Sequence, residues 1–433
     1  MNYPHRVTRQ PNGDNHYSWP EADYFEARPF GSMLLQSEAI RARMRTSRFS
    51  PLFFSAASLS AKTRLGFFMT GSNFTSRWAS AVCSNKHLTS LVLQQAGIRI
   101  PFGASFQYSD IAAANEFLGR LQGKGVLKPL EGGSGRAVSV GLETAEDLRK
   151  AHAQLRKGES FRVEEYVPGR DYRVLVCNGQ VLSVVERVSA RAVGNGASTI
   201  RQLIEQKNAK RLTHPRYRFA LLQAENPIIA TTIHQQGLSW ESIPRQGTVV
   251  LLNEAANVSL GGEYHERVTE TDTSITTFAV DVAEAVGGLG HYGVDLLLQD
   301  HRQPLASQPH AVCEVNSHSD ITACSFPTRG VPINCVGAVF RHNAAQAGIP
   351  PGPPHDSVED HLAAYGVNDV NRYVGWVAEC SAALGVRVTQ ARVSGNNVLR
   401  SAAGETPAVA AVAAKAIRPT PALAAAYVDT TPA

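Results

Sequence analysis

The chain has 433 residues, enough for about two to four structural units, and its 43% hydrophobic and 18% charged residues are typical of a globular protein. The net charge of +5 is small for this length and comes without a Lys/Arg cluster, so no nucleic-acid partner is expected. No apolar run reaches the length of a membrane span, residues 1–19 lack the apolar core of a secretory signal, and the 6 cysteines are scattered, which together favours a cytoplasmic location with reduced thiols.

The two ends of the chain are predicted to be disordered. Residues 1–30 are polar and contain several prolines, and residues 404–433 are rich in alanine, proline and threonine. Inside these ends we expect a small N-terminal lobe over 31–83 and a helical extension over 349–403. The elements expected in these flanks are a helix over 33–45, a strand over 65–69, helices over 358–365 and 370–384, and a short strand over 386–393.

Between the flanks, hydrophobic spacing and capping residues predict alternating helices and strands. Asn85 opens a helix that Gly97 ends, and Thr144 with Asp147 resembles a capping box. Asn178-Gly179 is the strongest short signal for a β-hairpin in the chain. Residues 213–245 show no clear pattern. The other expected elements are strands over 161–167, 248–252, 292–299 and 310–315, a hairpin over 172–188, and helices over 199–212, 272–287 and 331–347.

The first candidate for chemistry lies in residues 125–137. Lys128 follows a short apolar run. The glycine-rich loop Gly132-Gly133-Ser134-Gly135 comes after it, and a second apolar run follows the loop. Glycines let backbone N–H groups face phosphate oxygens, and Lys128 adds a positive charge beside them. The pattern predicts a strand, a loop folded over an anion, and a second strand. An ordinary hairpin turn fits this fragment about equally well when it is taken alone.

The second candidate is a group of oxygen-bearing side chains near the end of the predicted core. Asp295 lies within an apolar strand, and Glu314 and Asn316 are two residues apart on another strand, so these two share one face. A carboxylate is costly to bury unless a cation compensates it, and two acids with an amide suit Mg²⁺. The alternative is that the acids pair with arginines such as Arg187.

The third candidate is the end of the strand at 161–167. Glu164 and Val167 are three residues apart there, and Asp171 follows after a Pro-Gly turn. Such a linker can offer a carboxylate to an exocyclic amine, a backbone amide to a ring nitrogen and a second acid to two hydroxyls, as adenosine requires. A solvated strand end is the better interpretation of this fragment by itself.

Taken together, these features resemble the ATP-grasp superfamily, most of all the ATP-grasp parts of cyanophycin synthetase and of the bifunctional glutathione-synthesising ligase. The resemblance covers about 71–348. The matching fragments, in order, are 84–89 with 95–101, Leu127-Lys128-Pro129 with its glycine loop, 163–173, 193–196 with Thr199-Ile200, 257–262, Gly293-Val294-Asp295 and Glu314-Val315-Asn316. The resemblance implies an α+β (α/β) fold in which a central subdomain, 84–160, and a C-terminal subdomain, 161–348, grip ATP.

The resemblance also implies roles for individual residues. ATP and one or two Mg²⁺ ions (or Mn²⁺) would be the cofactors. The phosphates would be held by Lys86 and Lys128 under the loop Gly132-Gly133-Ser134-Gly135, and the adenosine by Glu164, Glu165, the backbone of Val167 and Asp171. The metal would be held by Asp295, Glu314 and Asn316, whereas Arg173, Arg187 and Asn257 would face the transferred phosphoryl group or the substrate carboxylate.

The sequence departs from the family pattern at the substrate end of the site rather than at the ATP end. Asn195 stands where an acid is usual, Asn253-Glu254 stands where arginine is typical, and residues 317–320 replace the usual Asn-x-x-Pro-Gly continuation. His318 and Asp320 are candidates for contact with an amine substrate, and a surface loop is the alternative.

The implied reaction is carboxylate activation. A substrate carboxylate attacks the γ-phosphorus of ATP, and an amine then attacks the acyl phosphate to give an amide, ADP and phosphate. The resemblance favours amino acids or short peptides as substrates, a γ-glutamyl-type linkage and a possible homo-oligomer, with no nucleic acid or membrane as partner. The alternatives are a non-catalytic ATP-binding module and a different phosphotransfer enzyme with the same ATP site.

Overall fold

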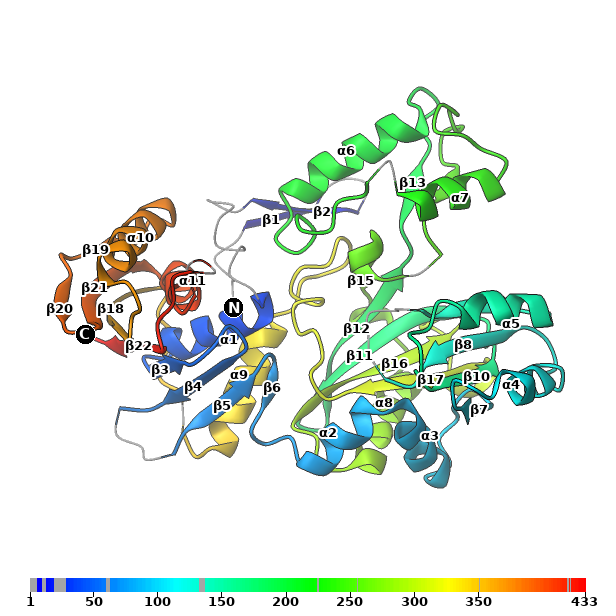
Figure 1. Cartoon of the computed structure of the whole chain (residues 1–433), viewed down its shortest axis with the longest axis horizontal. Helices are drawn as coiled ribbons and strands as arrows, with labels where there is room; N and C mark the ends of the chain where they lie inside the picture. Colours follow the sequence, from blue (N-terminus) through cyan, green and yellow to red (C-terminus); the bar gives the residue numbers. More distant parts are fainter. Residues whose placement is uncertain are drawn as a thin grey trace.

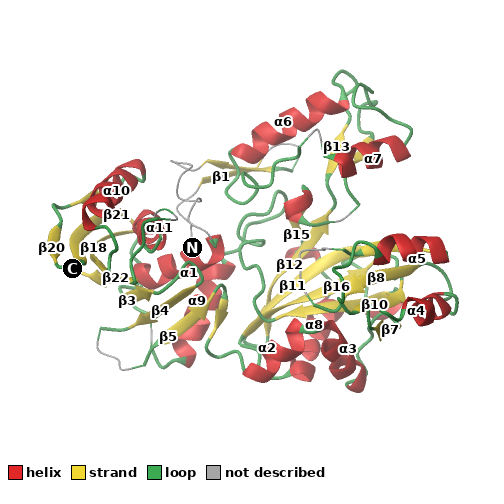
Figure 2. Cartoon of the chain, in the orientation of Figure 1, coloured by secondary structure: helices red, strands yellow, loops and turns green. Residues whose placement is uncertain are grey.

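The computed structural model describes residues 6–9, 13–18, 29–59, 63–131, 137–223, 226–254, 256–349, 351–418, 420 and 422–433. Strands and helices alternate along most of this length, and the two ends of the chain meet in one body beside a larger body built from its middle (Figures 1 and 2). None of the described helices combines the length and apolar character needed to cross a membrane.

The larger body is organised around a five-stranded antiparallel sheet in the order β15-β12-β11-β16-β17. Helices pack on one face of it, where alternate strand residues such as Tyr172, Val174 and Val294 form a core with them. The other face keeps the charged residues of the same strands. The elements are α2 (Arg77–Ser84), α3 (Lys86–Gln95), β11 (Arg170–Cys177), β12 (Gln180–Val188), β15 (Glu263–Glu266), α8 (Thr273–Val286), β16 (His291–Leu298) and β17 (His310–Asn316).

Local signals in this body are confirmed. Asn178 and Gly179 both have positive φ, +55° and +65°, in the two-residue turn that joins β11 to β12. The side chain of Asn85 accepts hydrogen bonds from the first backbone N–H groups of α3. Thr144 and Asp147 form the expected capping box, and Thr199 caps the helix that follows it.

A smaller four-stranded sheet, in the order β7-β10-β8-β9, forms the second part of this body with two helices against it. Its elements are β7 (Gly103–Phe106), α4 (Ile111–Leu118), β8 (Gly125–Pro129), β9 (Ser139–Leu142), α5 (Ala145–His152) and β10 (Phe161–Glu165). The expected boundaries at 84–160 and 161–348 therefore change. Helix α3 packs with the larger sheet, and β10 lies in the middle of the smaller one.

Residues 189–254 form an insertion between β12 and β15 with its own small apolar core. Its two-stranded sheet carries two helices, and it lies beyond the β15 edge of the larger sheet (Figure 1). The elements are β13 (Arg191–Val193), α6 (Ile200–Leu212), α7 (Pro227–Gln235) and β14 (Val249–Leu251). Helix α7 falls in the stretch that shows no clear sequence pattern, and it begins with a proline in its first turn.

The two ends of the chain share a nine-stranded sheet, in which β22 from the C-terminus pairs with β3 from the N-terminal lobe. Helices α1 and α11 pack together against it, and α9 packs on α1. The elements are α1 (Phe30–Arg41), β3 (Arg45–Arg48), β4 (Phe53–Ala57), β5 (Leu65–Phe68), β6 (Gly71–Ser72), α9 (Cys335–Gln346), β18 (Ser357–Tyr365), α10 (Val370–Ala383), β19 (Arg387–Val388), β20 (Arg392–Ser394), β21 (Asn397–Glu405), α11 (Thr406–Ala416) and β22 (Tyr427–Pro432).

The prediction of a disordered tail over 404–433 is wrong. Helix α11 is buried along nearly its whole length, because its alanines let it pack closely against α1, and β22 lies inside the nine-stranded sheet. The helical extension over 349–403 is only partly helical. Residues 358–365, expected as a helix, form the central strand β18, where Val358, Asp360 and Leu362 are buried and the residues between them are exposed.

The prediction of disorder over 1–30 also needs correction. Strand β1 (Arg6–Arg9) pairs with β2 (Asn15–Ser18), and the hydroxyl of Tyr17 donates to the carbonyl of Pro327 at 2.7 Å. Helix α1 begins at Phe30. Residues 1–5, 10–12 and 19–28 lie outside the described part of the chain, as does the glycine-rich loop Gly132-Gly133-Ser134-Gly135.

Candidate active site

A cleft of about 2540 Å³ lies over the charged face of the five-stranded sheet. The smaller sheet, the insertion, the N-terminal lobe and the loop after β17 supply the rest of its lining. The cleft gathers every predicted site residue that the structure describes, namely Lys86, Lys128, Glu164, Glu165, Val167, Asp171, Arg173, Arg187, Asn257, Asp295, Glu314 and Asn316.

Strand register places the charged residues opposite one another. Arg187 on β12 faces Asp171 on β11, Arg173 on β11 faces Asp295 on β16, and Asp295 faces Glu314 on β17. Residues directly opposite in an antiparallel pair lie on the same face of the sheet. The floor of the cleft is therefore a row of neighbouring acids and arginines that crosses four strands.

Asp295 is the centre of this row. Its carboxylate accepts two hydrogen bonds from Arg173, at 2.7 and 2.8 Å, and one from Arg187 at 2.9 Å. Arg187 also contacts Asp171 at 2.7 Å. Burial alone would raise the pKa of Asp295, but the two guanidinium groups outweigh it and hold that pKa below its usual value. Asp295 therefore stays ionised and holds both arginines in place. This is the pairing of an acid with arginines that the sequence suggested as the alternative to a metal site.

Glu314 has different surroundings from Asp295. Among the described residues it forms no ion pair within 4 Å, and burial together with the neighbouring charge of Asp295 raises its pKa. The amide of Asn316, oriented to satisfy its neighbours, donates to Glu314 at 3.3 Å and accepts from Arg173 at 3.3 Å. A hard cation at this point would relieve the repulsion between the two acids. Carboxylate and amide oxygens are the donors that Mg²⁺ accepts, so the residues fit such an ion.

Lys128 belongs to a second group of paired charges. Its ammonium lies 2.6 Å from Glu164, whose other oxygen accepts from Arg162 at 3.0 Å, and these side chains are almost fully buried. All three residues come from adjacent strands of the smaller sheet, where Lys128 and Arg162 are cross-strand partners. In this state Glu164 orients Lys128 toward the cleft.

The remaining predicted residues border the same space. Lys86 is the first residue of α3, and its backbone N–H donates to Leu130 at 3.3 Å. Glu165 accepts from the backbone N–H of Phe102 at 3.0 Å and pairs with Arg99 at 3.1 Å, so its carboxylate links β10 to the segment before β7. Asn257 begins a tight 3₁₀ turn, η2 (Val258–Leu260), and its carbonyl accepts from the N–H of Gly262 at 2.9 Å.

The cleft also contains residues that sequence reasoning missed. Arg216, Tyr264 and Thr70 all line it, together with His318 and Asp320. Arg216 lies in the stretch without a clear pattern, and Thr70 lies in the N-terminal lobe, so neither carried a motif. The departure of residues 317–320 from the family pattern was the one signal that pointed here.

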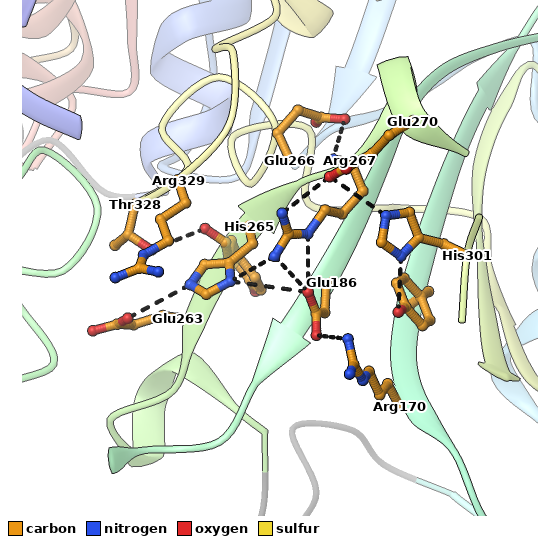
Figure 3. Close-up of polar contacts among 12 residues, drawn as sticks. Arg170, Glu186, Glu263, His265, Glu266, Arg267, Glu270, His301, Thr328 and Arg329 are labelled. Atoms are coloured by element: carbon orange, nitrogen blue, oxygen red, sulfur yellow. Dashed lines mark hydrogen bonds and ion pairs between the residues drawn. The ribbon is translucent and has the colours of Figure 1, made fainter. Parts of the chain in front are cut away.

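Strand β15, which carries Tyr264, is fastened to the sheet by a polar network (Figure 3). Arg267 donates to Glu186 at 2.9 Å and contacts Glu270 at 3.1 Å, and Glu270 lies 3.4 Å from His301. The short helices η3 (Val268–Glu270) and η4 (Leu305–Ser307) flank this network. The network fixes the edge of the sheet that faces the insertion.

Comparison with known proteins agrees with this geometry. The sequence profile of the ATP-grasp domain matches residues 83–319. Cyanophycin synthetase of Trichormus variabilis is 32% identical over 259 residues, 59% of this chain and 28% of that protein. The glutathione biosynthesis bifunctional protein of Listeria innocua is 33% identical over 251 residues, 57% of this chain and 32% of that protein. The chain thus spans less than a third of the length of these curated relatives.

A likeness among solved structures supports the same fold. The bifunctional glutathione synthetase from Pasteurella multocida matches 74% of this chain and 44% of its own, with a TM-score of 0.56 and 24% identity. The predicted α+β fold with two subdomains around a cleft is therefore confirmed.

Proposed function

Because the chain belongs to the ATP-grasp family, we propose that it is an ATP-dependent ligase that joins a substrate carboxylate to an amine and releases ADP and phosphate. The relatives of this chain are named as enzymes of cyanophycin and glutathione synthesis. Amino acids or short peptides are accordingly the proposed substrates. We further propose that the enzyme works in the cytoplasm, where ATP is abundant, and that it forms a homo-oligomer.

The nucleotide would bind in the space between the two sheets. Lys86 and Lys128 would neutralise phosphate charge, as two cations at separate points of one cleft can do. Glu164, the backbone of Val167 and Asp171 would bind the adenosine. Glu164 and Asp171 each pair with a cation here, Lys128 and Arg187, and the lone pairs left on each carboxylate would accept the amine and hydroxyl groups of the nucleotide.

Asp295, Glu314 and Asn316 would hold Mg²⁺. The fit rests on the repulsion between Asp295 and Glu314 and on the oxygen donors of all three side chains. Within the described residues, no three His, Cys, Asp or Glu side chains form a ready-made metal cage, so phosphate oxygens would complete the shell. The ion would supply charge neutralisation to the triphosphate.

Arg173 and Arg187 would act on the reacting groups. Both are fixed by Asp295 and aligned along the floor of the cleft, so their remaining N–H groups are preorganised donors. Such donors stabilise charge that develops on the transferred phosphoryl group and on the attacked carboxylate. The acyl phosphate must be protected from water, and the insertion beside the cleft, with the turn at Asn257, is placed to exclude it.

The observation that carries the proposal is the charged row on four strands with two lysines in the same cleft. A non-catalytic ATP-binding module would not need it. The experiment offers MgATP with pairs of amino acids and measures ADP and phosphate. Release of both in equal amounts, only when a carboxylic acid and an amine are present, supports the ligase. Tight MgATP binding without release from any pair would instead favour the binding module.

A further inference from the structure

Two polar side chains at the substrate end of the cleft have hydrogen-bonding capacity that the protein does not use. The guanidinium of Arg216 contacts Asp320 at 2.6 Å through one terminal nitrogen. Its Nε atom is buried and has no partner among the described residues. A buried donor without an acceptor destabilises the fold, so an acceptor brought by a ligand would be favoured here.

Tyr264 lines the same cleft as Arg216, close enough for the charge of each to affect the other. Its backbone is fully engaged, because its N–H donates to the hydroxyl of Tyr217 at 2.8 Å and its carbonyl accepts from Thr328 at 2.8 Å. Its own hydroxyl forms no hydrogen bond within the described residues. Register places Tyr264 opposite Arg187, at the sheet edge farthest from Glu314 and Asn316. It therefore shares the charged face of the sheet with Arg187.

Asp320 orients the guanidinium rather than leaving it to move. Its other oxygen accepts hydrogen bonds from the backbone N–H of Thr322 at 3.0 Å and from the hydroxyl of Thr322 at 2.5 Å. The carbonyl of Ser319 accepts from Thr70 at 2.9 Å, which ties the same loop to the N-terminal lobe. A guanidinium fixed at one side presents its remaining N–H groups in a defined plane, the arrangement that suits a carboxylate.

We propose that Arg216 and Tyr264 form a subsite for the α-carboxylate of an amino-acid substrate, with Asp320 as the positioning residue. The inference rests on the proposed ligase function and names the substrate class that this function would use. A carboxylate held there would direct the rest of the amino acid along β15 toward Arg187. The structural alternative is an Arg216–Asp320 ion pair that only fastens the loop at 317–322.

The test compares an acid with its carboxamide. The twenty L-α-amino acids are offered in pairs with MgATP to the full chain, and the amine substrate of the active pair is then replaced by its carboxamide. We expect the parent to lose about 10–100-fold in kcat/KM with the carboxamide, the size of a lost hydrogen bond to a charged group. Arg216→Gln should lose a similar factor with the acid, through KM, and almost nothing more with the carboxamide.

Two further variants complete the design. Tyr264→Phe keeps the ring and should raise KM for the acid about 3–10-fold, as expected for one neutral hydrogen bond. The matched control is Arg302→Gln, which breaks another arginine–aspartate pair, at 3.0 Å from Asp300 on the surface, and should leave both substrates unchanged. Unaltered affinity of the Arg216 variant for MgADP shows that it is folded.

The outcomes separate the subsite from the ligase function. An active Arg216→Gln protein with the parent's ratio between acid and carboxamide overturns the subsite and leaves the ligase intact. If no pair releases ADP, the ligase fails, and calorimetry of the same amino acids and carboxamides with the MgADP complex still decides the subsite. Binding of an acid over its carboxamide, abolished by Arg216→Gln, supports it, and equal or absent binding overturns it.

Discussion

The two ends of the cleft are built in opposite ways. At the proposed nucleotide end, the charged groups stand on strands of two antiparallel sheets, and Asp295, Glu164 and Asp171 each pair with a cation supplied by a neighbouring strand. At the proposed substrate end, the lining comes from the N-terminal lobe, the loop at 317–322, the segment around Arg216 and strand β15. Among the described residues, the Nε atom of Arg216 has no hydrogen-bond partner there.

This difference separates a part of the site that strand register positions from a part that contacts between distant segments position. Strand register fixes the row from Arg187 to Glu314, so a change there should affect both stability and nucleotide chemistry. The substrate end depends on contacts between segments far apart in the chain, and a change there should alter substrate choice more than ATP binding. The following experiments test that contrast.

The largest effect is expected from Asp295→Asn. The substitution removes the negative charge that two buried arginines share, and an unpaired buried charge costs about 3–5 kcal/mol. Urea unfolding of the ligand-free protein measures the loss. Asp300→Asn, in a surface pair with Arg302, is the control and should change stability by less than about 0.5 kcal/mol. A loss below about 1 kcal/mol at Asp295 would mean that the row is not a structural unit.

Lys128→Ala should reduce kcat/KM for ATP by about 10²–10³-fold, since one preorganised donor at a developing charge contributes that much. The measurement is steady-state ADP release at saturating amine and acid. Lys150→Ala removes a lysine whose side chain is 70% exposed on α5 and should leave turnover unchanged. Equal turnover by the Lys128 variant and the parent would remove this residue from the nucleotide site.

Where the larger body meets the N-terminal lobe, the buried His291 should make the free energy of unfolding fall at acid pH. Burial, together with the charges of His318 and His342, lowers the pKa of His291 from 6.5 to about 4. Because the folded-state pKa is the lower one, the unfolded chain binds the proton more tightly, and stability falls as pH drops from 6.5 toward 4, by about 3 kcal/mol in total.

Urea unfolding between about pH 4 and pH 7.5 measures this slope. His291→Phe should flatten it, and substitution of the exposed His234 by Gln should leave it as steep as in the parent. If the slope survives without His291, another group is responsible for the acid sensitivity.

The smallest effect is expected from Gly71→Ala, which acts only at the substrate end. A Cβ atom at Gly71 would overlap the imidazole of His318, and displacing that ring should cost about 1–2 kcal/mol and raise KM for the substrates but not for ATP. Gly375→Ala on α10 meets nothing within 4 Å and should be neutral or slightly stabilising. An equal rise in KM for ATP would show that the two ends are not independent.

The amino-acid pattern alone was sufficient for the features that depend on neighbours within a few residues. The capping box at Thr144, the turn at Asn178-Gly179 and the strands that carry Lys128 and Asp295 could be predicted because caps, turns and periodicity are local. The ATP-binding fragments are short and contiguous for the same reason. Their order along the chain was enough to identify the fold.

The identity of the charged partners is set by the complete fold. The pairing of Arg173 with Asp295, like the approach of Arg216 to Asp320, joins residues more than 100 positions apart. The chain ends also depend on distant partners. The alanine-rich tail forms a buried helix that packs on α1 and an inner strand that pairs with β3. The conformational preferences of short segments do not identify such distant partners, because the free energy of burial depends on surfaces that only the folded chain brings together.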